Sequence, residues 1–554
     1  MNRWPMIRLT QLLLSVILLT VAVSGVHAQT SELGKVEFPT SGSPRAQEHF
    51  LRGLAALHSF WYEEALEAFR ESTKAEPDFM MGYWGEAMAH NHPLWTEQDT
   101  PAGREVIAKI KDTAKLTARE RAYLNAVKMV YGEGDKRTRD AAYSSAMEKI
   151  YRDYPDDLNA AAFYALSLLG LVRSEDKSYR LQARAGAIAL EVYQKNPNHP
   201  GAAHYIIHAF DDPDHAILAL PAARRYAGIA PEAHHARHMP SHIFLQLGMW
   251  PEAAASNQSA WEASDTWMRR KKLSPNVRDY HSLHWLMYAK LQQGQYRQAE
   301  ELLALMKKTM SESTYDNKLR PGYYENNYAN MAAAFVIETE RWDLAATIFP
   351  ATSPSSQAPA ASGHGAHGSS APSDGPMTVR YSNIGQRLPI FTKNLAAALK
   401  GSMKTAPTIP DVNVDSPGNA ASVIGELQVA AAFASMSGEH DNAIGLGREA
   451  VRREEKMGPP SGPPSLVKPS HELLGEILLR AGKPSEAAEQ FKIALLRQPN
   501  RARSLLGSAR AAAKMGDQRG AISAYARLSE QWRNADKELP ELLEAQNFLK
   551  QARF

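Results

Sequence analysis

The chain has 554 residues, of which 44% are hydrophobic and 22% are charged, so its composition is that of a globular protein. It contains no cysteine, which excludes disulfides, thiolate metal sites and cysteine nucleophiles. The 63 basic and 60 acidic side chains give a net charge of +3, which is too balanced to predict a nucleic-acid-binding surface or a polybasic membrane patch.

Residues 1–28 have the layout of a secretory signal peptide. Arg3 and Arg8 precede an apolar run over residues 12–23, and residues 26–28 place small side chains at the cleavage position. The run is too short for a permanent membrane-spanning helix, and the absence of cysteine excludes a lipoprotein. We therefore expect an exported chain, periplasmic or secreted, with no stable membrane anchor after cleavage.

Helical repeats are indicated by two segments with the same order of residue types. Each segment holds a Gly, an Ala, a Phe and a final Pro: Gly53, Ala65, Phe69 and Pro77 in the first, and Gly475, Ala487, Phe491 and Pro499 in the second. This order is typical of the tetratricopeptide repeat (TPR). The small residues lie where two helices cross, the Phe fills the gap between them, and the Pro ends the second helix.

Further copies are indicated by a turn residue that is followed, in most cases five positions later, by alanine. These turn residues are Asp214, Gly248, Gly294, Glu340, Gly438 and Gly482, with a looser copy at Gly516. Spacings of 34 residues match one repeat, and spacings of 46 predict longer helices with loops around Pro275 and Pro321. No alternating strand pattern is found. The sequence therefore predicts an all-α fold, a TPR α-solenoid of about eight or more helix-turn-helix repeats.

Two segments interrupt the repeats. Residues 351–378 are rich in Ala, Ser, Gly and Pro, and we interpret them as a flexible low-complexity linker. They separate an N-terminal TPR array, residues 40–350, from a C-terminal TPR array, residues 379–554. The Pro-rich residues 458–464 predict a shorter irregular connection. Composition leaves open whether the two arrays form one continuous superhelix.

Common catalytic motifs are absent from the sequence. There is no phosphate-binding loop, dinucleotide fingerprint, nucleophile elbow, His-Glu-x-x-His helix or EF-hand loop. The sequence identifies no catalytic residue and favours a protein that is not an enzyme.

Histidines are concentrated in the central repeats, where eight of the 19 lie between residues 199 and 242. Ring or amide side chains recur ten and six residues before successive turn residues. The positions are held by His204 and His208, by His238 and His242, by His284 and Tyr288, and by Asn330 ten residues before its turn. Residues four apart share a helix face. Because first helices line the concave side of this repeat class, we expect a ladder of polar side chains facing the groove.

Other polar side chains lie near this ladder in the sequence. His92 is expected to end an earlier first helix, His235 and His281 precede ladder histidines by three residues, and Asn327 opens the next helix. Pro240 is expected in a first helical turn, which leaves the direction of His238 undetermined. His58, beside a turn, is expected at the surface.

Three interpretations of the ladder stay open. The first is a Zn, Cu or Fe site built from His204, His208, His238 and His242, with His235, His281 or His284 as further ligands. The second is a groove that binds a partner protein, a peptide or a small ligand. In the third, the histidines only pack between helices. In a metalloenzyme, a metal-bound water would be the nucleophile, with Asp211, Asp212 or Glu86 as outer partners.

The segments 201–208, 221–231, 235–244 and 279–285, with the Pro-rich connection after residue 458, resemble a family of bacterial exported TPR proteins that carry a His-x-x-His-Met-Pro-Ser-His segment. The resemblance covers nearly all of the mature chain. The family positions are matched by His204, His208, His235, His238, His242 and His281, whereas His284 stands where the family has an acidic residue. The resemblance supports the fold and implies no particular function.

The sequence thus predicts an exported TPR protein whose His-lined groove binds a protein, peptide or small ligand. The alternative is a metal-binding protein or metalloenzyme that uses the same histidines.

Overall fold

The structure is a computed structural model that describes residues 32–95, 97–173, 176, 178–312, 323–349, 384–409, 417–464 and 466–552. The predicted signal peptide and the predicted linker lie outside the described residues. The described residues from Leu33 onward form one compact unit. Within the described ranges, no helix is long and apolar enough to cross a membrane.

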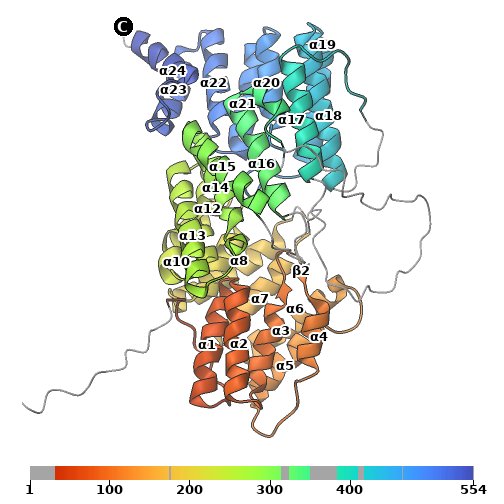
Figure 1. Cartoon of the computed structure of the whole chain (residues 1–554), viewed down its shortest axis with the longest axis vertical. Coiled ribbons are helices and arrows are strands. Elements are labelled where there is room, and N and C mark those ends of the chain that lie inside the picture. Colours follow the sequence, from red (N-terminus) through yellow and green to blue (C-terminus); the bar gives the residue numbers. More distant parts are fainter. Residues whose placement is uncertain are drawn as a thin grey trace, which may run out of the picture. The chain divides into compact units, whose positions relative to one another are not determined.

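The chain is almost entirely helical (Figure 1). The first half contains α1 (Pro44–His58), α2 (Tyr62–Ala75), α3 (Met80–Ala89), α4 (Thr100–Ile107), α5 (Ala118–Val130), α6 (Lys136–Asp153), α7 (Leu158–Gly170), α8 (Arg180–Lys195), α9 (Pro200–Ala209), α10 (Ala216–Ile229), α11 (His234–His238) and α12 (Pro240–Gln246). The second half contains α13 (Trp250–Lys271), η1 (Pro275–Val277), α14 (Tyr280–Gln292), α15 (Tyr296–Glu312), α16 (Tyr323–Thr339), η2 (Trp342–Ala346), α17 (Ile384–Leu399), α18 (Pro417–Met436), α19 (His440–Glu455), α20 (Ser470–Arg480), α21 (Pro484–Arg497), α22 (Ala502–Met515), α23 (Gln518–Gln531) and α24 (Pro540–Gln551).

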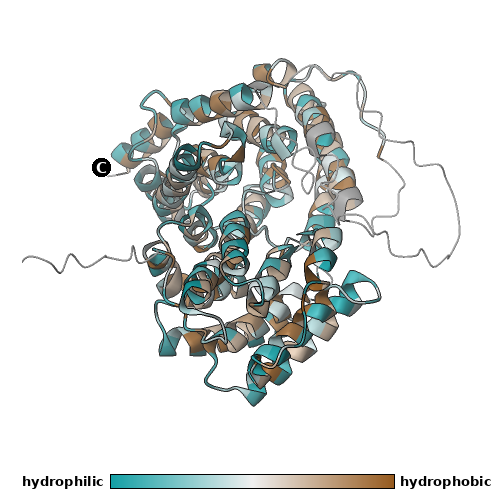
Figure 2. Cartoon of the chain, turned by 60° about the horizontal axis from the view of Figure 1, so that its bottom comes forward, coloured by the Kyte–Doolittle hydropathy of each residue, from teal (hydrophilic) through white to brown (hydrophobic). Residues whose placement is uncertain are grey.

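The helices stack as repeated pairs. Most helices pack on the next one in the chain, and the first helices of neighbouring pairs also touch, as α7 touches α9, α14 touches α16 and α20 touches α22. In Figure 2 many helices carry hydrophobic residues on one side and hydrophilic residues on the other, as expected when each pair buries its apolar face on its neighbours. The predicted all-α TPR solenoid is confirmed.

Close helix crossings depend on glycine, as the sequence predicts. A Cβ atom on Gly53 would lie 2.8 Å from the ring of Phe69, and one on Gly475 would lie 2.7 Å from the ring of Phe491. Both rings are fully buried. The two segments with the clearest repeat pattern therefore share the same packing at opposite ends of the chain.

The predicted turn residues lie in turns, and most of them have a left-handed backbone. Gly248 and Gly294 have φ of +66° and +68°, and Glu340 takes the same left-handed region at +52°. Asp214 has no positive φ; its backbone N–H instead donates to the carboxylate of Asp212. The 46-residue units owe their length partly to α13, which has 22 residues, and to η1 around Pro275.

A short hairpin appears where no strand was predicted. Strands β1 (Asn91–His92) and β2 (Glu97–Gln98) pair antiparallel, with His92 opposite Glu97. The expectation that His92 ends a first helix is wrong, because α3 already ends at Ala89. Pro93 follows His92, and a residue before proline is driven out of the helical region towards the extended one.

The two predicted arrays contact each other through their turns. Trp250 donates from Nε1 to the carbonyl of Asn500 at 2.8 Å, and Trp532 donates to the carbonyl of Gln292 at 2.9 Å. Both indole rings are buried. Loops of the C-terminal repeats therefore cover the turns of the central repeats, and this brings the Pro-rich residues 458–464 to the histidine-rich helices.

Candidate functional site

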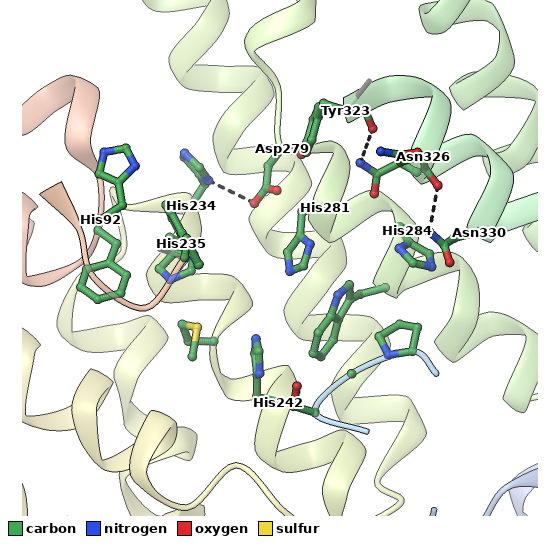
Figure 3. A pocket seen from close by; sticks show the side chains of 18 of the residues that line it. His92, His234, His235, His242, Asp279, His281, His284, Tyr323, Asn326 and Asn330 are labelled. Carbon is green, nitrogen blue, oxygen red and sulfur yellow. Dashed lines mark hydrogen bonds and ion pairs between the residues drawn. The ribbon is translucent and has the colours of Figure 1, made fainter. Parts of the chain in front are cut away.

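A cavity of about 1260 Å³ lies beside the central repeats. Its walls come from the turn between α1 and α2, the β hairpin, helices α9, α11, α12, α14 and α16, and the Pro-rich residues 458–464. Figure 3 shows His235, His242 and His281 around the same opening. The cavity therefore combines the predicted ladder with segments that are far away in the sequence.

Helix α9 positions the first histidine pair. Pro200 occupies its first turn, where no backbone donor is lost, and the ring of His199 accepts a hydrogen bond from the N–H of Ala202. Four residues apart, His204 and His208 then share one face. Their Nε2 atoms lie 3.1 Å from each other.

Helices α11 and α12 position the next histidines. Pro240 starts α12, as predicted, and Met239 joins the two helices in the right-handed helical region. The break does not turn His238 away, because its Nε2 atom lies 3.1 Å from Nε2 of His242. The sequence left the direction of the His238 side chain undetermined, and the structure shows that it points towards His242. The helical periodicity therefore continues across Pro240.

Six histidines form two groups of three. We call His204, His208 and His235 the α9 triad, and His238, His242 and His281 the α14 triad. Within each triad one nitrogen of every ring lies within 4.8 Å of the others. The two triads are neighbours, since the rings of His208 and His242 are 6.1 Å apart and those of His235 and His238 are 5.9 Å apart. The four histidines that the metal interpretation groups into one site belong to both triads, because α11 contributes one histidine to each.

Hydrogen bonds fix the ring orientations in the α14 triad. His238 donates from Nδ1 to the amide oxygen of Asn257 at 2.7 Å, and His242 donates from Nδ1 to the carboxylate of Asp211 at 2.7 Å. Asp211 also accepts from the amide of Gln246. Because a neutral imidazole carries one N–H, both Nε2 atoms then hold lone pairs. These are the two atoms that face each other at 3.1 Å.

The α9 triad has a comparable outer contact. His204 donates from Nδ1 to the backbone carbonyl of His58 at 2.8 Å, which leaves its Nε2 as an acceptor. His58 is fully buried between Tyr205 and Asn159, so the prediction of a surface position for it is wrong. Its segment is buried because the end of α1 packs on α9, a contact that sequence spacing does not reveal.

Burial favours the neutral form of five of the six triad imidazoles, because it lowers the pKa of each. It lowers the pKa of His204 and of His238 to about 3, and it holds the pKa of His208, His235 and His281 well below the ordinary value. The other histidines of the group lower these values further. Neutral imidazole is the form that binds metal ions.

Most of the predicted site residues line the cavity. These are His92, His208, His235, His242, His281, His284, Asn327 and Asn330. On α16, Asn330 donates to the carbonyl of Asn326 at 2.8 Å, and both residues face the cavity (Figure 3). Beside the hairpin, His92 contacts the carboxylate of Glu97 at 3.0 Å through Nδ1.

Three predicted residues do not line the cavity. His204 and His238 are fully buried behind it, where each contacts a lining histidine. Tyr288 is also buried, and its hydroxyl accepts a hydrogen bond from Arg501 at 2.8 Å. The ladder therefore does not face the groove uniformly: His204 and His238 lie behind lining histidines, and Arg501 of the C-terminal repeats covers Tyr288.

The sequence did not identify the aromatic wall or the proline wall. Trp285 lies 4.3 Å from the ring of His242, and a Cβ atom on Gly462 would lie 2.5 Å from Trp285. The indole of Trp285 therefore packs between the Pro-rich connection and the α14 triad. Another group of rings, with Phe60 and Tyr62, lines the cavity beside the α9 triad. The only available signal was the placement of Trp285 four residues after His281.

Neither the family models nor the curated proteins contain a match to this chain. Among solved structures, the APC/C hetero-tetramer Cut9–Hcn1 matches 92% of this chain and 76% of that chain at 10% identity, with a TM-score of 0.35. Yeast Tom70 matches 92% and 88% at 10% identity and a TM-score of 0.30. The TPR domain of P58(IPK) matches 92% and 99% at 13% identity and a TM-score of 0.20. These likenesses are distant, and the repeat architecture rests on the helix packing described above.

Proposed function

We propose that this chain is an exported TPR protein that binds a transition-metal ion through the α14 triad and uses it to hold a ligand in the cavity. The observation that carries the proposal is the pair of Nε2 atoms of His238 and His242. Both rings donate from Nδ1 to an oxygen, and both Nε2 lone pairs point at each other across 3.1 Å.

Two lone pairs at this distance repel each other unless a positive charge lies between them. Burial disfavours an added proton on His238, whose pKa it lowers to about 3. A metal ion between the two lone pairs removes this repulsion. Two nitrogens that each lie about 2.0–2.1 Å from a tetrahedral ion are about 3.3 Å from each other, which is close to the distance observed here. The outer contacts also suit a metal, since ligating histidines commonly donate their other N–H to a carboxylate or an amide oxygen.

The ligand types select the class of metal. All three ligands are neutral imidazoles, which suit Cu, Zn, Ni and Fe, whereas Mg, Ca and Mn prefer oxygen ligands. Three protein ligands leave one tetrahedral position open. His242 and His281 both line the cavity, so the open position would face a ligand there.

The test is elemental analysis of the mature chain purified without a polyhistidine tag, before and after incubation with Zn or Cu and dialysis. We expect stoichiometric metal in the wild type and loss of this ion in His242→Ala and in His281→Ala. His440→Ala is the matched control, because His440 begins α19 and does not line the cavity. A wild type that retains no metal would contradict the proposal.

A second candidate function is recognition of a peptide or partner protein without metal. The amides of Asn326, Asn327 and Asn330 favour it, since all three line the same cavity and offer the donors and acceptors that a peptide backbone requires. Pull-down from periplasmic extract, with metal-stripped wild type beside Asn327→Ala/Asn330→Ala, tests it. Loss of one partner in the double variant would support this function, and identical profiles would count against it.

A further inference from the structure

The α9 triad is a second group of convergent nitrogens that the proposed ion does not use. Its Nε2 atoms of His204 and His208 are 3.1 Å apart, the same separation as in the α14 triad. Nε2 of His235 is buried without a hydrogen-bond partner among the described residues. A buried nitrogen without a partner costs free energy, and a bound ion would satisfy it.

The two triads are joined by one stretch of helix. His235 belongs to the α9 triad, and His238 and His242, three and seven residues later, belong to the α14 triad. These spacings place all three side chains on one helix face. His208, His235, His242 and His281 all line the same cavity. Ions held by the two triads would therefore direct their open positions into the same space.

Met239 lies on this helix face between the two triads. It is four residues after His235 and three before His242, and it lines the cavity. Its thioether is a soft donor, of the kind that selects monovalent copper. The chain has no cysteine, and neither triad includes a carboxylate.

Charge gives a further reason for copper. Two divalent ions on six neutral imidazoles would add four positive charges to a buried site. Asp211 and Asp279 lie outside the triads and accept from His242 and His234. The glutamates that line the cavity, Glu63, Glu67, Glu97 and Glu454, belong to neither triad. Uncompensated buried charge is costly, so the site favours monovalent ions, or divalent ions together with an anionic ligand.

We propose that the α9 and α14 triads bind two copper ions as one coupled centre, whose external ligand is a small two-donor molecule that bridges both ions from the cavity. This inference rests on the proposed metal function and adds the second ion, its identity and the class of ligand. Azide serves as the probe, because it is small, anionic and able to donate from both ends.

The test compares copper content and electron paramagnetic resonance of the mature protein loaded with Cu(II) in the presence of azide, which serves as the anionic bridging ligand. The wild type should hold two copper ions per chain and give far less signal than two isolated Cu(II) ions, because coupled spins cancel. His235→Gln and His281→Gln should each hold one ion with the full signal of one isolated Cu(II). Glutamine keeps a polar side chain at each position, and circular dichroism checks that both variants fold.

Azide should produce a new absorption band in the wild type and a weaker one in each single-site variant. Met239→Leu should lower Cu(I) affinity about tenfold, the lower end of the effect that residues around the metal ligands have on affinity, while Zn affinity stays unchanged.

One copper with a full signal in the wild type, unaffected by His235→Gln, would overturn the inference but leave the proposed function intact. A wild type without metal would overturn both. Two ions with two full, uncoupled signals, or an azide band equally strong in the variants, would overturn the coupled centre.

Discussion

The central and the C-terminal repeats use the same helix positions in opposite ways. Ten and six residues before the turn glycine, the central repeat places His238 and His242, and the C-terminal repeat places Glu472 and Glu476. The carboxylates are balanced by a cation, since Nζ of Lys468 lies 3.0 and 2.6 Å from them. The imidazoles contact no cation among the described residues, and their lone pairs face each other.

The C-terminal pair belongs to a buried ion network. Arg501 is fully buried and contacts Glu472 at 2.8 Å and Glu338 at 2.6 Å. Burial opposes this charge on Glu472, but the cations Arg501 and Lys468 hold its pKa below the ordinary value. The charged groups of this network pair with one another. The comparison shows that a buried pair of polar side chains indicates ligand binding only where no group of the protein pairs with its donors or lone pairs.

The largest effect is expected from Arg501→Met. Removing this cation leaves Glu338 without its ion pair to Arg501 and leaves Glu472 with Lys468 as its remaining cation, which should lower the free energy of unfolding by about 3–5 kcal/mol. Chemical denaturation measures the change. The exposed pair of Arg448 with Glu486 is the control, and Arg448→Met should change stability by less than about 1 kcal/mol. Equal changes in the free energy of unfolding for Arg501→Met and Arg448→Met would show that the buried ion network does not stabilise the fold more than an exposed ion pair.

An intermediate effect is expected from Asp211→Asn, which weakens the acceptor for Nδ1–H of His242. Metal affinity should fall about 10–100-fold, as for other carboxylates behind ligating histidines, while thermal stability changes little. Competition with a chelator measures the affinity. Asp214→Asn is the matched control, because Asp214 is exposed on the same loop. If Asp211→Asn leaves metal affinity unchanged, Asp211 does not support a metal ligand, and the contact between Asp211 and His242 is structural, like those of Glu472 and Glu476.

The smallest effects are expected at two turn glycines with the same backbone conformation. Gly438→Ala, at φ +83° with no neighbour within 4 Å of the added Cβ, should cost only the left-handed strain, about 1 kcal/mol. Gly248→Ala should cost more, because its Cβ would lie 2.5 Å from the carbonyl of Pro499. Thermal unfolding of the two variants tests whether the arrays meet at this turn. Equal losses would mean that they do not.

The sequence by itself determined the fold class and eight of the polar residues that line the cavity. Gly53 with Phe69 and Gly475 with Phe491 mark helix crossings, and such short-range patterns follow directly from helical geometry. The i, i+4 histidines are of the same kind, because helix α9 places His204 beside His208, and the helical periodicity that continues from α11 into α12 places His238 beside His242.

Only the tertiary structure decided how these pairs are grouped and which of them stay open. It divided six histidines into two triads, placed Asp211 behind His242, and covered Tyr288 with Arg501 from the C-terminal repeats. It also brought the Pro-rich residues 458–464 against Trp285. These contacts join residues from tens to more than two hundred positions apart, and their geometry depends on how whole repeats pack, which local periodicity does not encode.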